Sequence, residues 1–291
     1  MTASILARDP VSGELGAAVF TAYPSVGMRV PFAAPGVGAI ATQATAERSF
    51  GPRGLAMLRD GMSASAVVEQ LIAADPRSAH RQLAVLSADG ESAGFTGDAC
   101  VEYAEEVTGE HCRCQANAMA AQGVPEAMHA AFAESEGELS ERLLAALVAG
   151  ENAGGDARGR MSAALLVVPA EGEAWQATAD LRVDHHDDPL PELSRALDFH
   201  RAYALLDVAA ERGRAGDIDA AAEAGMAALA LAPDHPQLLL WMGLGVADGN
   251  LDMGTALVQR ALELQPSLRG FLERVPAAMM PAAPAVRARL T

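Results

Sequence analysis

The sequence predicts an α+β protein: a four-layer αββα sandwich followed by a small all-α helical region. Up to about residue 185, short apolar strand segments come in groups, and pairs of helical segments separate the groups. Antiparallel strands interleaved with helix pairs favour two stacked sheets with helices on their outer faces. Beyond residue 192 the chain is rich in alanine and leucine, which predicts helices alone.

Five segments form the first half of the predicted sandwich. The expected strands cover residues 4–9, 14–21 and 36–43, and the expected helices cover residues 52–59 and 64–74. Turn-forming residues join the first two strands as a hairpin. Ser63 precedes the second helix and supplies the hydroxyl that a helix N-cap needs.

The second half repeats the order of strands, two helices and strands. The expected strands cover residues 82–87, 92–96, 112–118, 162–168 and 175–183, and the expected helices cover residues 125–134 and 139–149. The first two of these strands form a hairpin across Ala88-Asp89-Gly90. The run at 162–168 is apolar after its serine, which is typical of a strand buried on both faces.

An internal repeat marks the helical region. Residues 215–219 return as 248–252 and residues 228–233 return as 261–266, an offset of 33 residues. This offset is close to the ~34 residues of tetratricopeptide repeats, in which each unit is a helical hairpin. Two hairpins are fewer than a free-standing array needs, so we expect them to dock on the main domain or to pair between subunits in a homodimer.

These differences in composition and pattern divide the chain into three parts. The sandwich domain covers residues 1–192, and the tetratricopeptide-like hairpins cover residues 193–275. The remaining residues, 276–291, are rich in proline and alanine and are predicted to be an irregular tail.

Composition and charge restrict the function. The net charge of −17 argues against a nucleic-acid partner, because each phosphate contact needs a cation. No lysine occurs in the chain, which excludes a lysine Schiff base, a phosphate-loop lysine and a lysine general base. The sequence has neither an apolar run of about 18 residues nor a secretory signal, so we expect no membrane partner and a cytoplasmic location.

Thr2 is the main candidate for chemistry. Threonine is small enough to allow removal of the initiator Met1. Removal frees an α-amine with a reference pKa of about 7.7–8.0, the one primary amine that a chain without lysine offers as a base. A hydroxyl activated by an adjacent base is the general pattern of nucleophilic catalysis. The alternative is a β-branched residue at an exposed strand start, with Ser4 on the same strand face as a neighbour.

Three other clusters contain residue types that can bind a ligand or a metal ion. Asp156 and Arg158 are candidates to bind a substrate carboxylate, although a structural ion pair in a glycine-rich turn is the favoured interpretation. Residues 111–114 contain a histidine and two cysteines but lack the second ligand pair of a structural zinc site. Residues 184–188 place adjacent histidines on opposite sides of an extended chain. We therefore expect inert buried cysteines, an acidic linker, and neither a metal nor a cofactor.

A series of motifs runs in order through the first 200 residues. The motifs are T-x-S-I-x-A-R-D-P at 2–10, G-V-G-A-x-A-T-Q-A at 36–44, G-P-R-G-L at 51–55, R-Q-x-x-V…F-T-G at 81–97, C-Q-x-N at 114–117, G-D-x-R-G-x-x-S-A-A-L-L-V-V at 155–168 and D-L-R-V-D-x-H-x-D-P at 180–189. In these motifs the main domain resembles DUF1028, a family of uncharacterised bacterial proteins assigned to the N-terminal nucleophile (Ntn) hydrolase superfamily.

The resemblance implies an Ntn-type αββα sandwich and an Ntn-type mechanism. In that superfamily the first residue of the mature chain attacks an amide carbonyl while its own α-amine takes the proton. Thr2 matches the nucleophile position, and Thr42 and Asn117 lie in family motifs and would supply polar contacts, as would Ser4.

One departure from the family concerns the charge near the nucleophile. In relatives the second strand often ends in a Ser-Lys pair, whereas this chain has Thr21-Ala22-Tyr23. The resemblance then requires Arg29 or Arg48 to supply the cation.

The leading hypothesis is an amidohydrolase that acts on a small amide, with Thr2 as nucleophile. The alternative is a non-catalytic Ntn-fold module for binding or assembly, which uses the helical repeats to hold a protein partner. A third reading is a zinc protein built on residues 111–114.

Overall fold

A computed structural model describes residues 2–290 of the chain, and its residues divide into two compact units. The first unit ends at Leu197 and the second begins at Asp198. The boundary falls inside one helix, α5 (Pro189–Arg214), whereas the sequence analysis placed it after residue 192.

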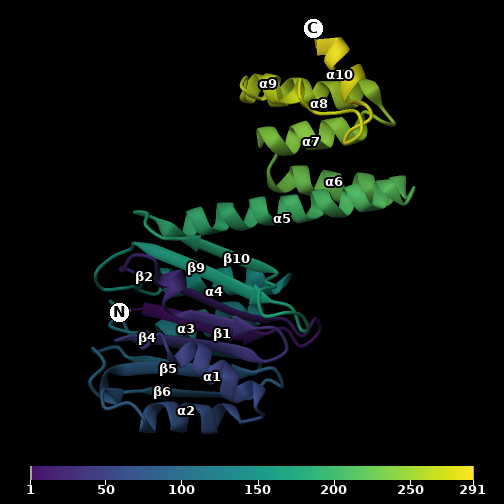
Figure 1. Cartoon of the computed structure of the whole chain (residues 1–291). Coiled ribbons are helices and arrows are strands. Elements are labelled where there is room, and N and C mark those ends of the chain that lie inside the picture. Colours follow the sequence, from purple (N-terminus) through teal and green to yellow (C-terminus); the bar gives the residue numbers. More distant parts are fainter. Residues whose placement is uncertain (1, 291) are drawn as a thin grey trace. The chain divides into compact units, whose positions relative to one another are not determined.

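The first unit is a mixed α/β structure with two antiparallel sheets, as predicted in outline (Figure 1). Its strands are β1 (Thr2–Arg8), β2 (Leu15–Thr21), β3 (Pro31–Ala34), β4 (Gly38–Ala44), β5 (Arg81–Ser87), β6 (Ser92–Thr96), β7 (Glu105–Gly109), β8 (Cys112–Asn117), β9 (Ser162–Val168) and β10 (Ala179–Val183). Its helices are α1 (Phe50–Arg59), α2 (Ala64–Ala73), α3 (Val124–Glu134) and α4 (Leu139–Asn152), with short 3₁₀ turns η1 (Val26–Met28) and η2 (Ser78–His80). Strands β3 and β7 were not predicted, and β10 is shorter than predicted.

The six-stranded sheet has the order β10-β9-β2-β1-β8-β7, and the four-stranded sheet has the order β3-β4-β5-β6. Helices α1 and α2 pack on the four-stranded sheet, while α3 and α4 pack on the six-stranded sheet. The two sheets contact each other through β1, β2, β7, β8 and β9 on one side and β3, β4, β5 and β6 on the other. β1 therefore lies at the centre of the unit, between β2 and β8 and against β4.

Alternation along the strands decides which side chains face the second sheet. In β1, Ile5 packs in the core beneath α3 and α4, whereas Leu6 packs in the core between the sheets. Successive residues of a strand point to opposite faces, so Thr2 and Ser4 share the inter-sheet face with Leu6. The inter-sheet core is built from alanine, valine and leucine side chains, among them Ala17 and Ala84. At the end of β1 that carries Thr2, polar side chains replace this apolar core.

The second unit is helical in the part that the structure describes. After α5 it contains α6 (Ile218–Leu231), α7 (Pro236–Val246), α8 (Leu251–Leu264), α9 (Leu268–Leu272) and α10 (Ala283–Leu290). The bounds of α6 and α8 differ by the offset of the sequence repeat. Asp217 and Asn250 cap these two helices in the same way, by accepting a hydrogen bond from a backbone N–H three residues later. The sequence repeat is therefore also a repeat of helix and cap.

The C-terminal segment is not an irregular tail, and that prediction is wrong for residues 283–290. They form α10, and Ala283 and Val286 are buried in the same core as α7 and α8. Proline at the start of this segment misled the interpretation, because proline breaks a helix interior yet is tolerated in the first helical turn.

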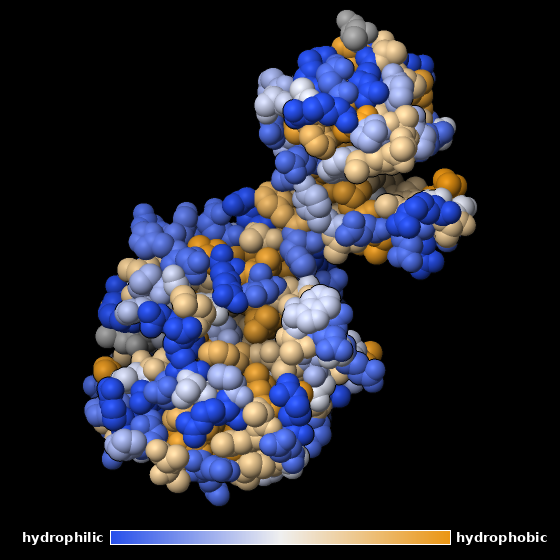
Figure 2. Space-filling view, in the orientation of Figure 1, coloured by the Kyte–Doolittle hydropathy of each residue, from blue (hydrophilic) through white to orange (hydrophobic). Residues whose placement is uncertain are grey.

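Charged and polar residues cover most of the visible surface of each unit, with smaller apolar patches among them (Figure 2). Within residues 2–290, none of the helices combines the length and the apolar character that crossing a lipid bilayer requires.

Candidate active site

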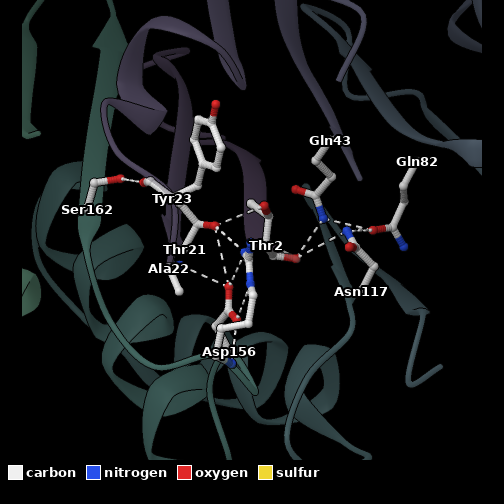
Figure 3. Close-up of polar contacts among 10 residues, drawn as sticks. Thr2, Thr21, Ala22, Tyr23, Gln43, Gln82, Asn117, Asp156 and Ser162 are labelled. Atoms are coloured by element: carbon white, nitrogen blue, oxygen red, sulfur yellow. Dashed lines mark hydrogen bonds and ion pairs between the residues drawn. The ribbon is translucent and has the colours of Figure 1, made fainter. Parts of the chain in front are cut away.

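Thr2 begins β1 on the inter-sheet face and is 7% exposed. Its hydroxyl donates a hydrogen bond to the hydroxyl of Thr21, with an Oγ1–Oγ1 distance of 3.3 Å. Its carbonyl oxygen accepts hydrogen bonds from Gln43 Nε2 at 3.0 Å and from Asn117 Nδ2 at 3.5 Å. Thr2 therefore lies between a hydroxyl on one side and two amides on the other (Figure 3).

Thr21 connects Thr2 to a buried carboxylate. The Thr21 hydroxyl donates to Asp156 Oδ2 at 3.4 Å, and the same oxygen accepts from the backbone N–H of Ala22 at 2.9 Å. Both hydroxyl contacts are longer than an ordinary O–H···O hydrogen bond. The two contacts form a chain from the Thr2 hydroxyl through Thr21 to the Asp156 carboxylate.

Asp156 forms an ion pair with Arg158, as the favoured sequence interpretation expected. Arg158 Nη2 lies 2.9 Å from Asp156 Oδ2, and Arg158 Nε lies 3.2 Å from Asp156 Oδ1. Arg158 Nη2 is also 3.5 Å from the Thr21 hydroxyl. The cation within hydrogen-bond range of Thr21 is thus Arg158, where the sequence suggested Arg29 or Arg48.

Burial of Asp156 raises the pKa of its carboxyl group, but hydrogen bonds from Arg158 and from the Ala22 N–H outweigh burial and hold the pKa below its ordinary value. The ionised carboxylate consequently stabilises the folded state above the unfolded pKa of about 3.9. This stabilisation is lost as the pH falls through the lower folded-state pKa.

We expect Asp156→Asn to lower the free energy of unfolding by about 1–3 kcal/mol at pH 7. Removing one partner of a fully buried ion pair lowers stability by more than this. The Arg158 side chain, however, is 37% exposed, so water can solvate its charge. The difference from wild type should shrink below about pH 4, where the wild-type carboxylate also becomes protonated. Urea unfolding as a function of pH measures this difference in the free energy of unfolding.

The matched control is Asp180→Asn, which breaks the exposed ion pair with Arg182. Exposed pairs contribute about 0–1 kcal/mol, so this variant should differ little from wild type at any pH. An Asp156→Asn effect that stays constant from pH 7 to pH 3 would contradict the assigned role of the charge.

A network of buried amides extends from Thr2 across the gap between the sheets. Gln82 Oε1 accepts from Gln43 Nε2 at 2.8 Å and from Asn117 Nδ2 at 2.9 Å. Gln82 Nε2 donates to the Ala116 carbonyl at 2.9 Å. Four strands contribute to this amide network. Gln43 of β4 and Asn117 of β8 contact Thr2 of β1, and Gln82 of β5 contacts both of these amides. The network fixes the Thr2 carbonyl and ties the two sheets together.

Ser4 belongs to the same network. Its hydroxyl donates to Gln43 Oε1 at 2.7 Å and accepts from Gln115 Nε2 at 3.3 Å. Ser4 therefore lies on the same face as Thr2, as predicted, but its contacts are with amides that position Thr2.

Thr42 is not brought to Thr2. It precedes Gln43 in β4 and therefore faces the side of the sheet that α1 covers, where Ile40 packs. Its hydroxyl accepts a hydrogen bond from the Glu47 N–H at 3.3 Å. The neighbouring Gln43 makes the contact with Thr2 instead.

The segment after β2 folds back over the end of β9. Ser162 Oγ donates to the Tyr23 carbonyl at 2.5 Å and accepts from the Val26 N–H at 3.2 Å. Gly27 lies so close to β9 that a Cβ atom there would be 2.8 Å from Ala164 Cβ and 2.9 Å from Arg182 Cδ. Ser162 is thus a structural residue that holds residues 22–29 in place.

Gly27→Ala should lower the free energy of unfolding by about 1–3 kcal/mol, because the added methyl group overlaps a side chain fixed on a strand. Urea unfolding followed by circular dichroism measures the loss. The control is Gly245→Ala in α7, where no atom lies within 4 Å of the added Cβ and the better helix propensity of alanine should stabilise by up to about 1 kcal/mol. Equal stability of Gly27→Ala and wild type would show that the segment is free to move.

Other sequence candidates lie apart from Thr2. Cys112 and Cys114 are reduced and buried in the core beneath α3 and α4. The acidic stretch 184–188 is exposed. Within residues 2–290, His, Cys, Asp and Glu side chains do not gather in any group of three that could hold a metal ion.

Sequence reasoning named Asn117, whose side chain contacts Thr2, but missed the other residues that surround Thr2. Thr21 was noted only as a departure from a Ser-Lys pair, and Gln43 and Gln82 were not singled out. The sequence held part of the information needed to find Thr21, Gln43 and Gln82, because each is a polar residue near the end of a largely apolar strand.

Comparison with known proteins agrees with the motif series. The model of a family described as "Family of unknown function (DUF1028)" matches residues 2–193. The crystal structure of protein SPO2555 from Silicibacter pomeroyi, described with the DUF1028 family model, has 34% sequence identity and a TM-score of 0.63, over 67% of this chain and 84% of that one. No curated protein matches the chain. A family match over two thirds of the chain and this identity together show that the chain belongs to the DUF1028 family.

Proposed function

We propose that the chain is an Ntn-type amidohydrolase that cleaves a small amide, with Thr2 as nucleophile after removal of Met1. One observation carries the proposal: the Thr2 hydroxyl, at the start of the central strand, is hydrogen-bonded to Thr21 and through it to the Asp156–Arg158 pair. Met1 lies outside the residues that the structure describes, so its removal is part of the proposal.

The order of layers supports the proposal. A helix pair, two sheets in contact and a second helix pair follow one another, which is the arrangement that an Ntn-type αββα sandwich requires. In such a sandwich the nucleophile begins a strand at the centre of the structure, as Thr2 does.

The proposed reaction has two acyl-transfer steps. The α-amine of Thr2 takes the hydroxyl proton while Oγ1 attacks the amide carbonyl carbon. Collapse of the tetrahedral intermediate breaks the C–N bond, and the ammonium group returns the proton to the leaving nitrogen. Water then hydrolyses the ester on Thr2 by the same route. Asn117, directly opposite Thr2 in β8, has a side-chain amide of the kind that stabilises an oxyanion, and the N–H that makes the long 3.5 Å contact with the Thr2 carbonyl would turn to the oxyanion.

The Asp156–Arg158 pair has an electrostatic role in this reaction. The positive charge of Arg158 lies beside Thr21 and partly neutralises Asp156, so the α-amine of Thr2 does not face an uncompensated carboxylate. This matters because a nearby anion raises the pKa of an amine, and a base works best with a pKa near the working pH.

The test is acylation of the protein by a β-lactone, read by intact mass. Thr2 Oγ1 would attack the lactone carbonyl, the ring C–O bond would break, and the Thr2 proton would pass through the α-amine to the ring oxygen. Nothing leaves, so the mass rises by that of the whole probe. Label on Thr2 of protein that begins at Thr2 supports the proposal, and an unlabelled Thr2 in such protein contradicts it.

A second candidate function is a non-catalytic module for binding or assembly. The burial of Thr2, at 7% exposure, favours it, since a nucleophile must meet its substrate. In this case the tetratricopeptide-like pairing of α7 with α8 would hold a protein partner. The lactone experiment also decides between the two, because a buried structural threonine is not acylated.

A further inference from the structure

One arginine in the segment that follows β2 differs from the other arginines that have a buried Nε atom. Within residues 2–290, three arginines have a buried Nε atom without a hydrogen-bond partner: Arg29, Arg113 and Arg142. Arg113 is paired with Glu106 at 3.1 Å, and Arg142 is paired with Asp9 at 3.3 Å. Arg29 has no such carboxylate partner in the described part of the chain, and its guanidinium lies over the ring of Tyr23 at 4.8 Å.

The position of Arg29 is fixed by the fold. It follows η1, which Ser162 holds through Val26, and Gly27 packs directly against β9. The Arg29 N–H donates to the Val26 carbonyl at 2.9 Å. The unpaired charge is therefore held on an ordered segment, which lowers the entropic cost of binding a ligand.

Arg29 is connected to Thr2 through two neighbours. Thr21 contacts the Thr2 hydroxyl and is paired in register with Ser162. Tyr23 lies two residues after Thr21, is 46% exposed, and is bonded through its carbonyl to the same Ser162. Residues 21–23 thus join the hydroxyl that contacts Thr2 to the aromatic ring that contacts the Arg29 guanidinium.

The chemistry of the Arg29 guanidinium indicates the kind of ligand that it binds. A guanidinium binds a carboxylate with two parallel, charge-assisted hydrogen bonds. A partly buried cation without a counter-ion is costly, and a substrate anion would remove that cost. In a protein with a net charge of −17, an uncompensated arginine is the group that distinguishes this place from the surrounding surface.

We propose that Arg29 binds a carboxylate of the substrate, so that the substrate is an amide that also carries a carboxylate group. The inference rests on the proposed function, because it takes Thr2 as the reacting group. It adds the substrate class and a residue that determines specificity.

The experiment compares two β-lactone probes that are identical except that one ends in a carboxylate and the other in a carboxamide. In wild type, the carboxylate probe should acylate Thr2 about tenfold faster, as expected for one added charge-assisted contact. Arg29→Met should bring the ratio of the two rates to about one. Arg29→Lys keeps the charge but not the bidentate geometry, so it should retain an intermediate ratio.

The matched control is Arg53→Met, which removes an exposed arginine of α1 and should leave the wild-type ratio. Overall charge cannot produce the expected preference, because a net charge of −17 repels the anionic probe. The lysine variant keeps the test valid if Arg29→Met is unstable, since a ratio between one and the wild-type value in Arg29→Lys, together with normal circular dichroism, also supports the proposal.

The outcomes separate the two proposals. Absence of label from both probes on wild-type Thr2 overturns the proposed function. Equal rates for both probes on wild type, or an unchanged ratio in Arg29→Met, overturn the assignment of Arg29 and leave Thr2 as the nucleophile.

Discussion

Thr2→Ala should lose acylation by a β-lactone entirely, while Thr2→Ser should keep it. Alanine has no side-chain oxygen to attack the lactone carbonyl. Serine keeps the hydroxyl and the α-amine. The loss in rate should exceed about a thousandfold, as for removal of other catalytic nucleophiles. Intact mass and peptide mapping measure it.

The control for this experiment is Thr45→Ala, which removes an exposed threonine outside the amide network. It should be labelled at the wild-type rate. Protein that retains Met1 is a second control, because its Thr2 nitrogen is an amide and cannot act as a base. Label on Thr2→Ala at the wild-type rate, or on a residue other than Thr2, would exclude Thr2 as the nucleophile.

The rate of acylation should also increase with pH. The α-amine acts as a base only when neutral, so the rate should rise with pH through the amine pKa. Asp156 is ionised throughout this range, because its pKa lies below the ordinary value. A rate that changes only near pH 4 would indicate that a carboxylate, and not the amine, is the base.

The order of elements follows from periodicity, because alternation and helical spacing are local properties of the chain. β3 was missed because a four-residue strand that begins with proline has almost no local signal. The contacts at Thr2 depend instead on pairings between distant strands. Thr42 and Gln43 are adjacent and polar, and only the stacking of the two sheets decides that Gln43 faces Thr2.

The contacts of the charged residues were also only partly predictable from the sequence. The sequence brings Asp156 and Arg158 within two residues, so their ion pair was predictable from the turn. Their contact with Thr21 was not, because it requires β2 to lie beside β9 and the chain after Gly155 to return across that edge. Arg29 and Arg48 were named as substitutes for a lysine, whereas the structure places the Arg158 guanidinium within 3.5 Å of the Thr21 hydroxyl.

Substitution of Gln82 should cause a large loss of stability. Gln82→Met keeps the length of the side chain but removes both its donors and its acceptor, so the amides of Gln43 and Asn117 lose the oxygen that they share. The Ala116 carbonyl also loses its donor. Buried polar groups left without partners cost about 1–3 kcal/mol each, and some here keep other contacts, so the free energy of unfolding should fall by about 2–4 kcal/mol.

Because the chain has two compact units, the loss should be measured where it arises, by hydrogen exchange of the β5 and β8 amides. The control is Gln70→Met, on the exposed face of α2, which should change stability by less than about 0.5 kcal/mol. Gln82→Met should also slow acylation of Thr2, because Gln43 and Asn117 hold the Thr2 carbonyl and both depend on Gln82. A variant that loses stability while acylating at the wild-type rate would show that the amide network supports the fold alone. Slower acylation under conditions where the protein is fully folded would assign it the positioning of the nucleophile as well.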